Sequence, residues 1–152
     1  MADVEFHDYS IEVKNAMNTR IEAVLSECAG ELTSRVKRNS RVKTGKTKNS
    51  FRYGVSRNFA DGSFTAHIGS NDENAIWEEF GTGEYALNGD GRKGGWWYKN
   101  PNAKYTKTGK LRKGSKEFIF TKGKKPHRPF WRAFESLKPK IINRIQNSFK
   151  GM

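Results

Sequence analysis

One short acidic segment contains the candidates for metal binding or catalysis in this chain. Its carboxylates are Asp72, Glu73, Glu78, Glu79 and Glu84. Carboxylate oxygens bind hard divalent cations, and a metal held in this way can activate a phosphodiester bond for cleavage. The segment contains no histidine that could act as a general base, and none of its carboxylates forms a pair on a predicted strand. We therefore predict no catalytic residues and no enzymatic activity.

A phosphate-binding loop is suggested by Gly45-Lys46-Thr47, because this tripeptide ends the nucleotide-binding motif. That motif also requires a glycine at position 40, where this chain has Ser40. It should follow a strand, whereas this segment follows a predicted helix. We exclude nucleotide binding on these grounds.

The residue types that bind transition metals are few and scattered. The single Cys28 cannot form an internal disulfide, and its apolar helical position predicts a buried thiol rather than a nucleophile. His7, His67 and His127 are far apart in the sequence. Without clustered ligands, we expect neither a metal site nor a cofactor.

Residues 91–116 form a basic stretch with aromatic side chains, which suggests nucleic-acid binding. Rings that stack on bases, beside cations that bind phosphates, are typical of proteins that bind single strands or RNA. Strand alternation instead favours Trp96 and Tyr98 in a core, with Trp97 on the opposite face. No signature of sequence-specific recognition is present. The candidates for contact with DNA or a partner protein are Arg92, Lys93, Lys107, Lys110, Arg112 and Lys113.

Charge is arranged in blocks along the 152 residues, whose formal net charge is +13. Residues 1–34 and 58–90 are acidic, with net charges of −5 and −7, and residues 35–57 and 91–152 are basic, with +9 and +16. Blocks of opposite sign suit contacts between subunits or with a polyanion, although solvated faces are the alternative. Without a signal peptide or a long apolar run, we expect synthesis in a cytoplasm and no membrane partner.

Apolar spacing predicts the helices that position these groups. A long helix is expected over residues 8–36, with a stripe that includes Met17, and a final helix follows Pro126 and Pro129, with Pro139 kinking or restarting it. Its stripe is expected to pack on the sheet beside the N-terminal helix. Between them, one or two helical turns should end at Gly81, with their apolar side chains providing buried area. These side chains are Ile76, Trp77 and Phe80.

Alternating residues predict two hairpins. Residues 51–57 and 64–70 flank an Asp61-Gly62 turn, and residues 117–120 should pair with residues 96–98 around a flexible basic loop. Helices on one face of a small antiparallel sheet make this a single α+β domain. Its expected parts are the N-terminal helix (1–40), the first hairpin with the acidic turn (41–90), the second hairpin (91–125) and the C-terminal helix (126–152).

Three short segments carry a resemblance to a known family. They are the "KTG…NS" segment within residues 42–50, "W-x-E-F-G-T" at 77–82, and "TKG-x-KP" followed by "PF" within residues 121–130. In this order they resemble the tail-completion (head-tail joining) proteins of long-tailed double-stranded DNA bacteriophages, over roughly residues 40–135. The matching residues are Thr44, Gly45, Ser50, Trp77, Glu78, Glu79, Phe80, Gly81, Thr82, Pro126, Pro129 and Phe130.

The resemblance implies a non-enzymatic virion protein of the neck or tail, assembled in the bacterial host cytoplasm. It implies a homo-oligomeric ring, a hexamer or dodecamer, that contacts the adjoining connector and tail proteins and surrounds genomic DNA. We expect residues 72–90 to contact residues 35–57 of a neighbouring subunit, and residues 91–116 to face DNA or a partner ring. The alternative function is non-specific nucleic-acid binding. Trp96 directly before Trp97-Tyr98, and the lysine-rich insertion after them, depart from the family pattern.

Overall fold

The computed structural model describes residues 7–99 and 118–150, and it confirms the α+β class. The order of elements along the chain is α1 (Ser10–Asn39), α2 (Lys46–Ser50), β1 (Phe51–Arg57), β2 (Phe64–Ser70), α3 (Glu73–Phe80), the 3-10 helix η1 (Gly83–Tyr85), β3 (Trp96–Lys99), β4 (Phe118–Thr121) and α4 (Pro129–Ser148). No helix within these residues is long and apolar enough to cross a membrane.

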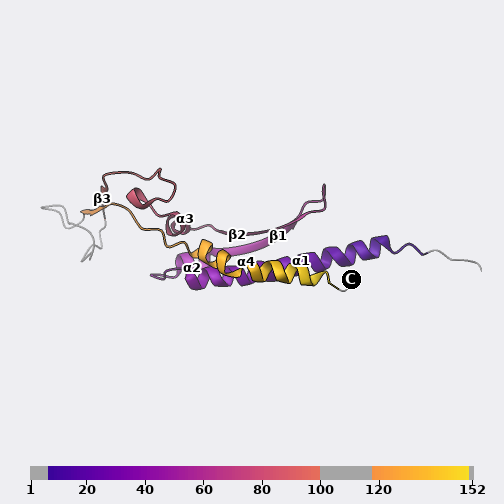
Figure 1. Ribbon diagram of the computed structural model, residues 1–152. Coiled ribbons are helices and arrows are strands. Elements are labelled where there is room, and N and C mark those ends of the chain that lie inside the picture. Colours follow the sequence, from indigo (N-terminus) through magenta and orange to yellow (C-terminus); the bar gives the residue numbers. More distant parts are fainter. Residues whose placement is uncertain (1–6, 100–117, 151–152) are drawn as a thin grey trace, which may run out of the picture.

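Helix α1 is the element against which the first hairpin and the C-terminal helix pack. The β1–β2 hairpin lies over it, and α4 runs beside it (Figure 1). The core contains Leu32 and Val36 of α1, Phe51 of β1, and Ala133 and Leu137 of α4. Helix α4 lies beside α1 as predicted, but it packs chiefly on α1 and not on the sheet.

The α1–α4 contact combines apolar and charged groups. Glu31 of α1 binds Lys140 at 2.6 Å and Arg144 at 3.1 Å. The hydrogen bond from Lys140 lowers the pKa of Glu31. Cys28 is buried as predicted, and burial raises the pKa of its thiol.

Pro139 does not restart α4, contrary to one of the predicted outcomes. The helix is continuous from Pro129 to Ser148. A proline removes one backbone hydrogen bond. Leu137 is buried and Ile141 packs against the core on the far side of the proline, so the same apolar stripe stabilises both halves of the helix.

The strands form two separate antiparallel hairpins, not one sheet. Strands β1 and β2 have the predicted bounds, and β3 pairs with β4 as expected, with Tyr98 opposite Ile119. The β3–β4 hairpin lies beyond α3, away from α1 (Figure 1). Because it has no helix packed across its face among the described elements, Tyr98 is 39% exposed and Trp96 only half-buried. Their predicted place in the core is wrong for Tyr98.

Candidate assembly site around helix α3

Helix α3 turns its apolar face outward, the reverse of the prediction. Ile76, Trp77 and Phe80 do share one face, but they are 62%, 45% and 46% exposed. The face toward the protein carries Ala75 and Glu78, both buried. Glu78 is therefore a structural group inside the fold, and the aromatic side chains are available at the surface.

Glu79 caps the N-terminus of α4. Its two carboxylate oxygens accept hydrogen bonds from the backbone N–H groups of Phe130 at 2.8 Å and Trp131 at 3.0 Å. The first N–H groups of a helix have no partner within that helix, and they attract negative charge. Pro129 at the start of α4 has no N–H, so Glu79 serves the next two donors.

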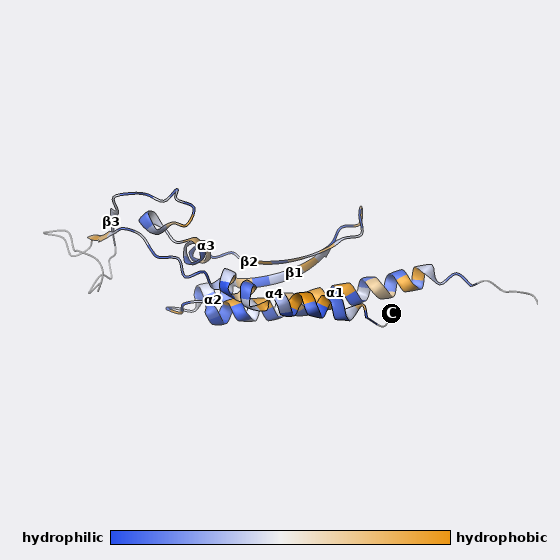
Figure 2. Cartoon of the chain, viewed as in Figure 1, coloured by the Kyte–Doolittle hydropathy of each residue, from blue (hydrophilic) through white to orange (hydrophobic). Residues whose placement is uncertain are grey.

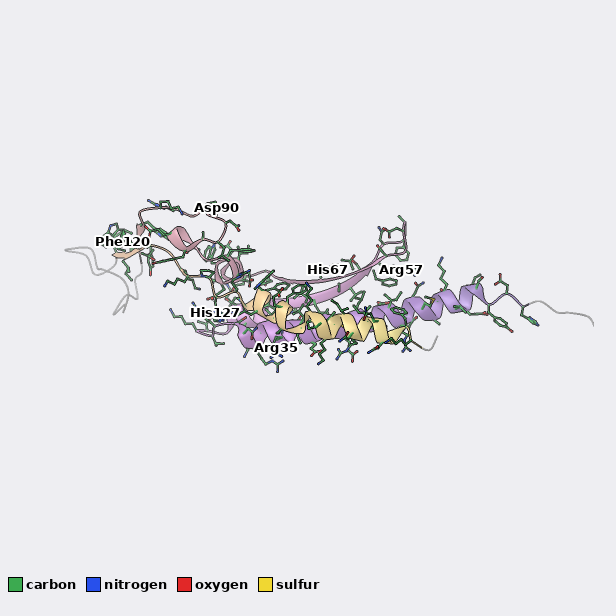
Figure 3. All side chains as sticks on the ribbon, viewed as in Figure 1. Arg35, Arg57, His67, Asp90, Phe120 and His127 are labelled. Atoms are coloured by element: carbon green, nitrogen blue, oxygen red, sulfur yellow. The ribbon has the colours of Figure 1, made fainter. Side chains whose placement is uncertain are left out.

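Glu78 joins α3 to the segment that precedes α4. Its backbone carbonyl accepts hydrogen bonds from the N–H groups of His127 at 2.7 Å and Arg128 at 3.1 Å. Its carboxylate pairs with Lys124. His127, labelled in Figure 3, contacts the carbonyl of Asn39 through Nε2 at 2.9 Å. The last turn of α1, α3 and the start of α4 are thereby joined at one point.

The turn after α3 lies directly against residues 122–124. Thr82 donates its backbone N–H to the Lys124 carbonyl, and its hydroxyl accepts the Lys124 N–H, both at 2.9 Å. Gly81 has φ 75°, and a Cβ there would lie 2.8 Å from Pro126 Cδ. Gly83, with φ 63°, would place a Cβ against the Lys122 carbonyl. Both glycines are required because the two segments approach closely.

The "KTG" segment also lies close to α3. Gly45, with φ 80°, starts α2. Asp72, just before α3, accepts a hydrogen bond from the Thr47 hydroxyl and lies 3.8 Å from Lys46 Nζ. The Thr47 hydrogen bond, followed by the Lys46 charge, lowers the pKa of Asp72. A cavity of about 590 Å³ lies between these segments, lined by residues 41–47, Asn74, Glu78 and Lys124.

The structure thus brings together the three segments that resemble the phage family. Thr44 and Gly45 line the cavity with Glu78, and Pro126 lies against Gly81. Ser50 contacts Ser70 at the end of the first hairpin. Phe130 packs on the core, while Trp77 and Phe80 point outward.

Three carboxylates of the acidic segment 72–90, which we expect to contact residues 35–57 of another subunit, form ion pairs within the chain. Asp72 binds Lys46, Glu78 binds Lys124, and Glu84 lies 3.4 Å from Lys122. Charge reversal at Glu78 would therefore disrupt the fold before it reported on assembly.

The candidate DNA-facing residues divide into two groups. Arg92 and Lys93 are exposed in the loop before β3, and the Arg92 guanidinium lies 6.0 Å from the centroid of the Trp96 ring. Trp97, 44% exposed, contacts Phe120 of the next strand. The other four candidates lie outside the described residues: Lys107, Lys110, Arg112 and Lys113.

Sequence reasoning missed three residues that complete this site: Lys124, His127 and Arg128. Arg128 is the only non-glycine residue with positive φ among those described, at 57°, and its guanidinium lies 4.7 Å from the Trp131 ring centroid. The placement of Pro126 and Pro129 around the pair His127-Arg128 was the available signal, since closely spaced prolines indicate a fixed chain path.

The site contains no arrangement suited to metal chemistry. Within residues 7–99 and 118–150, no group of three or more His, Cys, Asp or Glu side chains could hold a metal ion. Comparison with known proteins gave no matching family model, no matching curated protein and no matching solved structure.

Proposed function

We propose that this protein is a tail-completion or head-tail joining subunit of a bacteriophage or prophage, a non-enzymatic component of the virion neck. It forms a homo-oligomeric ring, a hexamer or a dodecamer, at the interface between head and tail. Its partners are further copies of itself and the adjoining connector and tail proteins, with genomic DNA passing through the lumen.

The observation that carries this proposal is the convergence of the three family-like segments on helix α3. They are separated by dozens of residues, yet Gly45, Glu78 and Pro126 all lie at one junction. Short motifs recur by chance, but chance matches have no reason to meet in the fold. Contacts of Glu78 and Glu79 join α3 to the segment around the start of α4, while Trp77 and Phe80 are exposed, as an assembly surface requires.

The test of the proposal is the mass and shape of the purified protein. Light scattering across a concentration series, followed by negative-stain electron microscopy, should reveal a discrete closed ring. A protein that stays monomeric at every concentration, or that forms only open chains, would refute a self-sufficient ring.

Non-specific nucleic-acid binding is a second candidate function, favoured by the exposed aromatic and basic groups before and on β3. Trp97 and Tyr98 are exposed beside Arg92 and Lys93. Phosphate contacts make such binding strongly salt-dependent. A DNA titration at two salt concentrations, with wild type and an Arg92→Ala/Lys93→Ala variant, should show weaker binding by the variant. Equal affinity for both proteins would exclude these two side chains from DNA contact.

A further inference from the structure

The first turns of α1 carry an apolar stripe that no described element of the chain covers. Val13 and Met17 continue, at four-residue spacing, the stripe that Ile21, Val24 and Cys28 form farther along the helix. Cys28 is buried and Ile21 and Val24 are half-buried, but Val13 and Met17 are 55% and 39% exposed. Figure 2 shows this part of α1 extending past the β1–β2 hairpin and the end of α4, with hydrophobic residues at its surface. A stripe of this kind indicates a surface that is covered in an assembly.

A small apolar cavity lies where this stripe enters the body of the protein. It has a volume of about 210 Å³, and its lining comes from α1, the hairpin and the end of α4. Ile21, Val24 and Phe64 contribute to the lining, together with Phe149. The stripe and the cavity form one continuous apolar surface, which we call the α1 surface.

The outward face of α3 is another exposed apolar surface of the described chain. Ile76, Trp77 and Phe80 lie on it, and Leu87 lies beside it because its N–H binds the Phe80 carbonyl. Tryptophan is the residue type that most often anchors a protein interface by filling a pocket. Trp77 at the centre of this face, which we call the α3 surface, has the form of such an anchor.

These two surfaces cannot meet within one chain. Helix α1 has 30 residues and is therefore about 45 Å long. The α3 surface lies toward its C-terminal end, and the α1 surface lies at its N-terminal end (Figure 1). A contact between two different surfaces of identical chains is heterologous, and it closes into a ring when the rotation between neighbours fits.

Charged groups at the edges of the two surfaces are complementary. Lys14 lies next to Met17 on α1, three residues before it, while Glu73 lies on the α3 face beside Ile76 and Trp77. Both are exposed, and neither has an ion pair within the described part of the chain. Each surface thus offers the other an apolar centre and one opposite charge.

We propose that the α3 surface of one copy docks on the α1 surface of the next copy, with Trp77 against Met17 and the adjoining cavity, and Glu73 against Lys14. This contact rests on the proposed ring and identifies its subunit interface. It is distinct from the carboxylate junction of Glu78 and Glu79, which holds α3 in place inside each chain.

Site-directed cross-linking tests the proposal. Two single-thiol variants, Val13→Cys and Leu87→Cys, are made in a Cys28→Ala background, so that Met17 and Trp77 stay in place, and their folding is checked by circular dichroism. Each is treated with a short bifunctional maleimide alone and after mixing with the other. A heterologous contact predicts a cross-linked dimer only in the mixture, because each variant alone presents its thiol to an unmodified partner residue. Cross-linking within either single variant, or none in the mixture, would overturn the proposed contact.

A charge exchange provides an independent arm. Lys14→Glu should weaken self-association at low salt by at least about tenfold if the pair is desolvated at the interface, and combining it with Glu73→Lys should restore association. A matched control is Lys138→Glu, which changes an equally exposed lysine in the middle of α4. Equal weakening by both single variants, or no rescue in the double variant, would contradict the pairing.

The outcomes separate this contact from the proposed function. A closed ring without the cross-link between positions 13 and 87 would retain the ring and overturn this interface. Cross-linked chains that never close would retain the interface and overturn the ring. A monomer without cross-links would overturn both.

Discussion

Replacement of Glu79 by alanine tests whether the carboxylates of α3 are structural. The substitution removes both acceptors of the Phe130 and Trp131 N–H groups, which lie at 2.8 and 3.0 Å from its oxygens. Loss of a helix cap costs about 0.5–2 kcal/mol, and a charge at a partly buried helix end contributes up to about 2 kcal/mol. Water can reach the exposed Trp131 side of the cap and recover part of this energy. We therefore expect a loss of about 2 kcal/mol, which corresponds to about 4–8 °C in Tm for a domain of this size.

The measurement is denaturant unfolding followed by far-ultraviolet circular dichroism, at a protein concentration where the chain is monomeric. Glu79→Gln should lose about half as much stability, because the amide retains one acceptor oxygen and loses the charge. Glu135→Ala is the matched control, since Glu135 is exposed in the middle of α4, and it should change stability by no more than about 0.5 kcal/mol. If Glu79→Ala were as stable as Glu135→Ala, the assignment of Glu79 as the α4 cap would be wrong.

Three further predictions concern the fold around the site. Leu137→Ala should lower the free energy of unfolding by about 2–4 kcal/mol, because Leu137 is 4% exposed in the core, and chemical denaturation would measure this loss. Gly83→Ala should lower the free energy of unfolding by about 2 kcal/mol or more, because φ is 63° and the new Cβ would meet the Lys122 carbonyl. Thermal unfolding would detect this loss as a lower Tm, and an unchanged Tm would contradict the close approach. The hydrogen bond from Thr47 lowers the folded-state pKa of Asp72. The stability that the Asp72 carboxylate gives the fold is therefore fully present above its ordinary pKa of 3.8 and is lost as the pH falls through the lowered pKa. Asp72→Asn should remove this contribution to the pH dependence of the free energy of unfolding. Identical pH profiles of stability for the variant and the wild type would refute the role of Asp72.

Local patterns were sufficient to predict most elements. Alternating residues and the Asp61-Gly62 turn predicted β1 and β2 with the bounds that the structure has, because side-chain alternation and turn geometry are properties of adjacent residues. The predicted helix over residues 8–36 corresponds to α1, which extends to Asn39. Its exact ends depend on capping contacts that the apolar period does not contain.

The orientation of α3 could not be predicted from its own residues. Its two faces differ clearly in polarity, and burial of the apolar face was the natural expectation. That expectation failed because the start of α4 presents unpaired N–H groups at Phe130 and Trp131, which need the carboxylate of Glu79. This requirement comes from a segment about fifty residues away along the chain.

The α+β class, the hairpin pairings, the helical stripes and the three family-like segments could all be predicted from the sequence, since each is encoded in short-range spacing and residue type. That those segments meet at α3, that Trp77 faces outward, and that the stripe of α1 continues past the body to Val13 became apparent only in the folded chain. The physical reason is that a residue's burial depends on which distant backbone and side-chain groups lie opposite it, and these are brought there only when the whole chain folds.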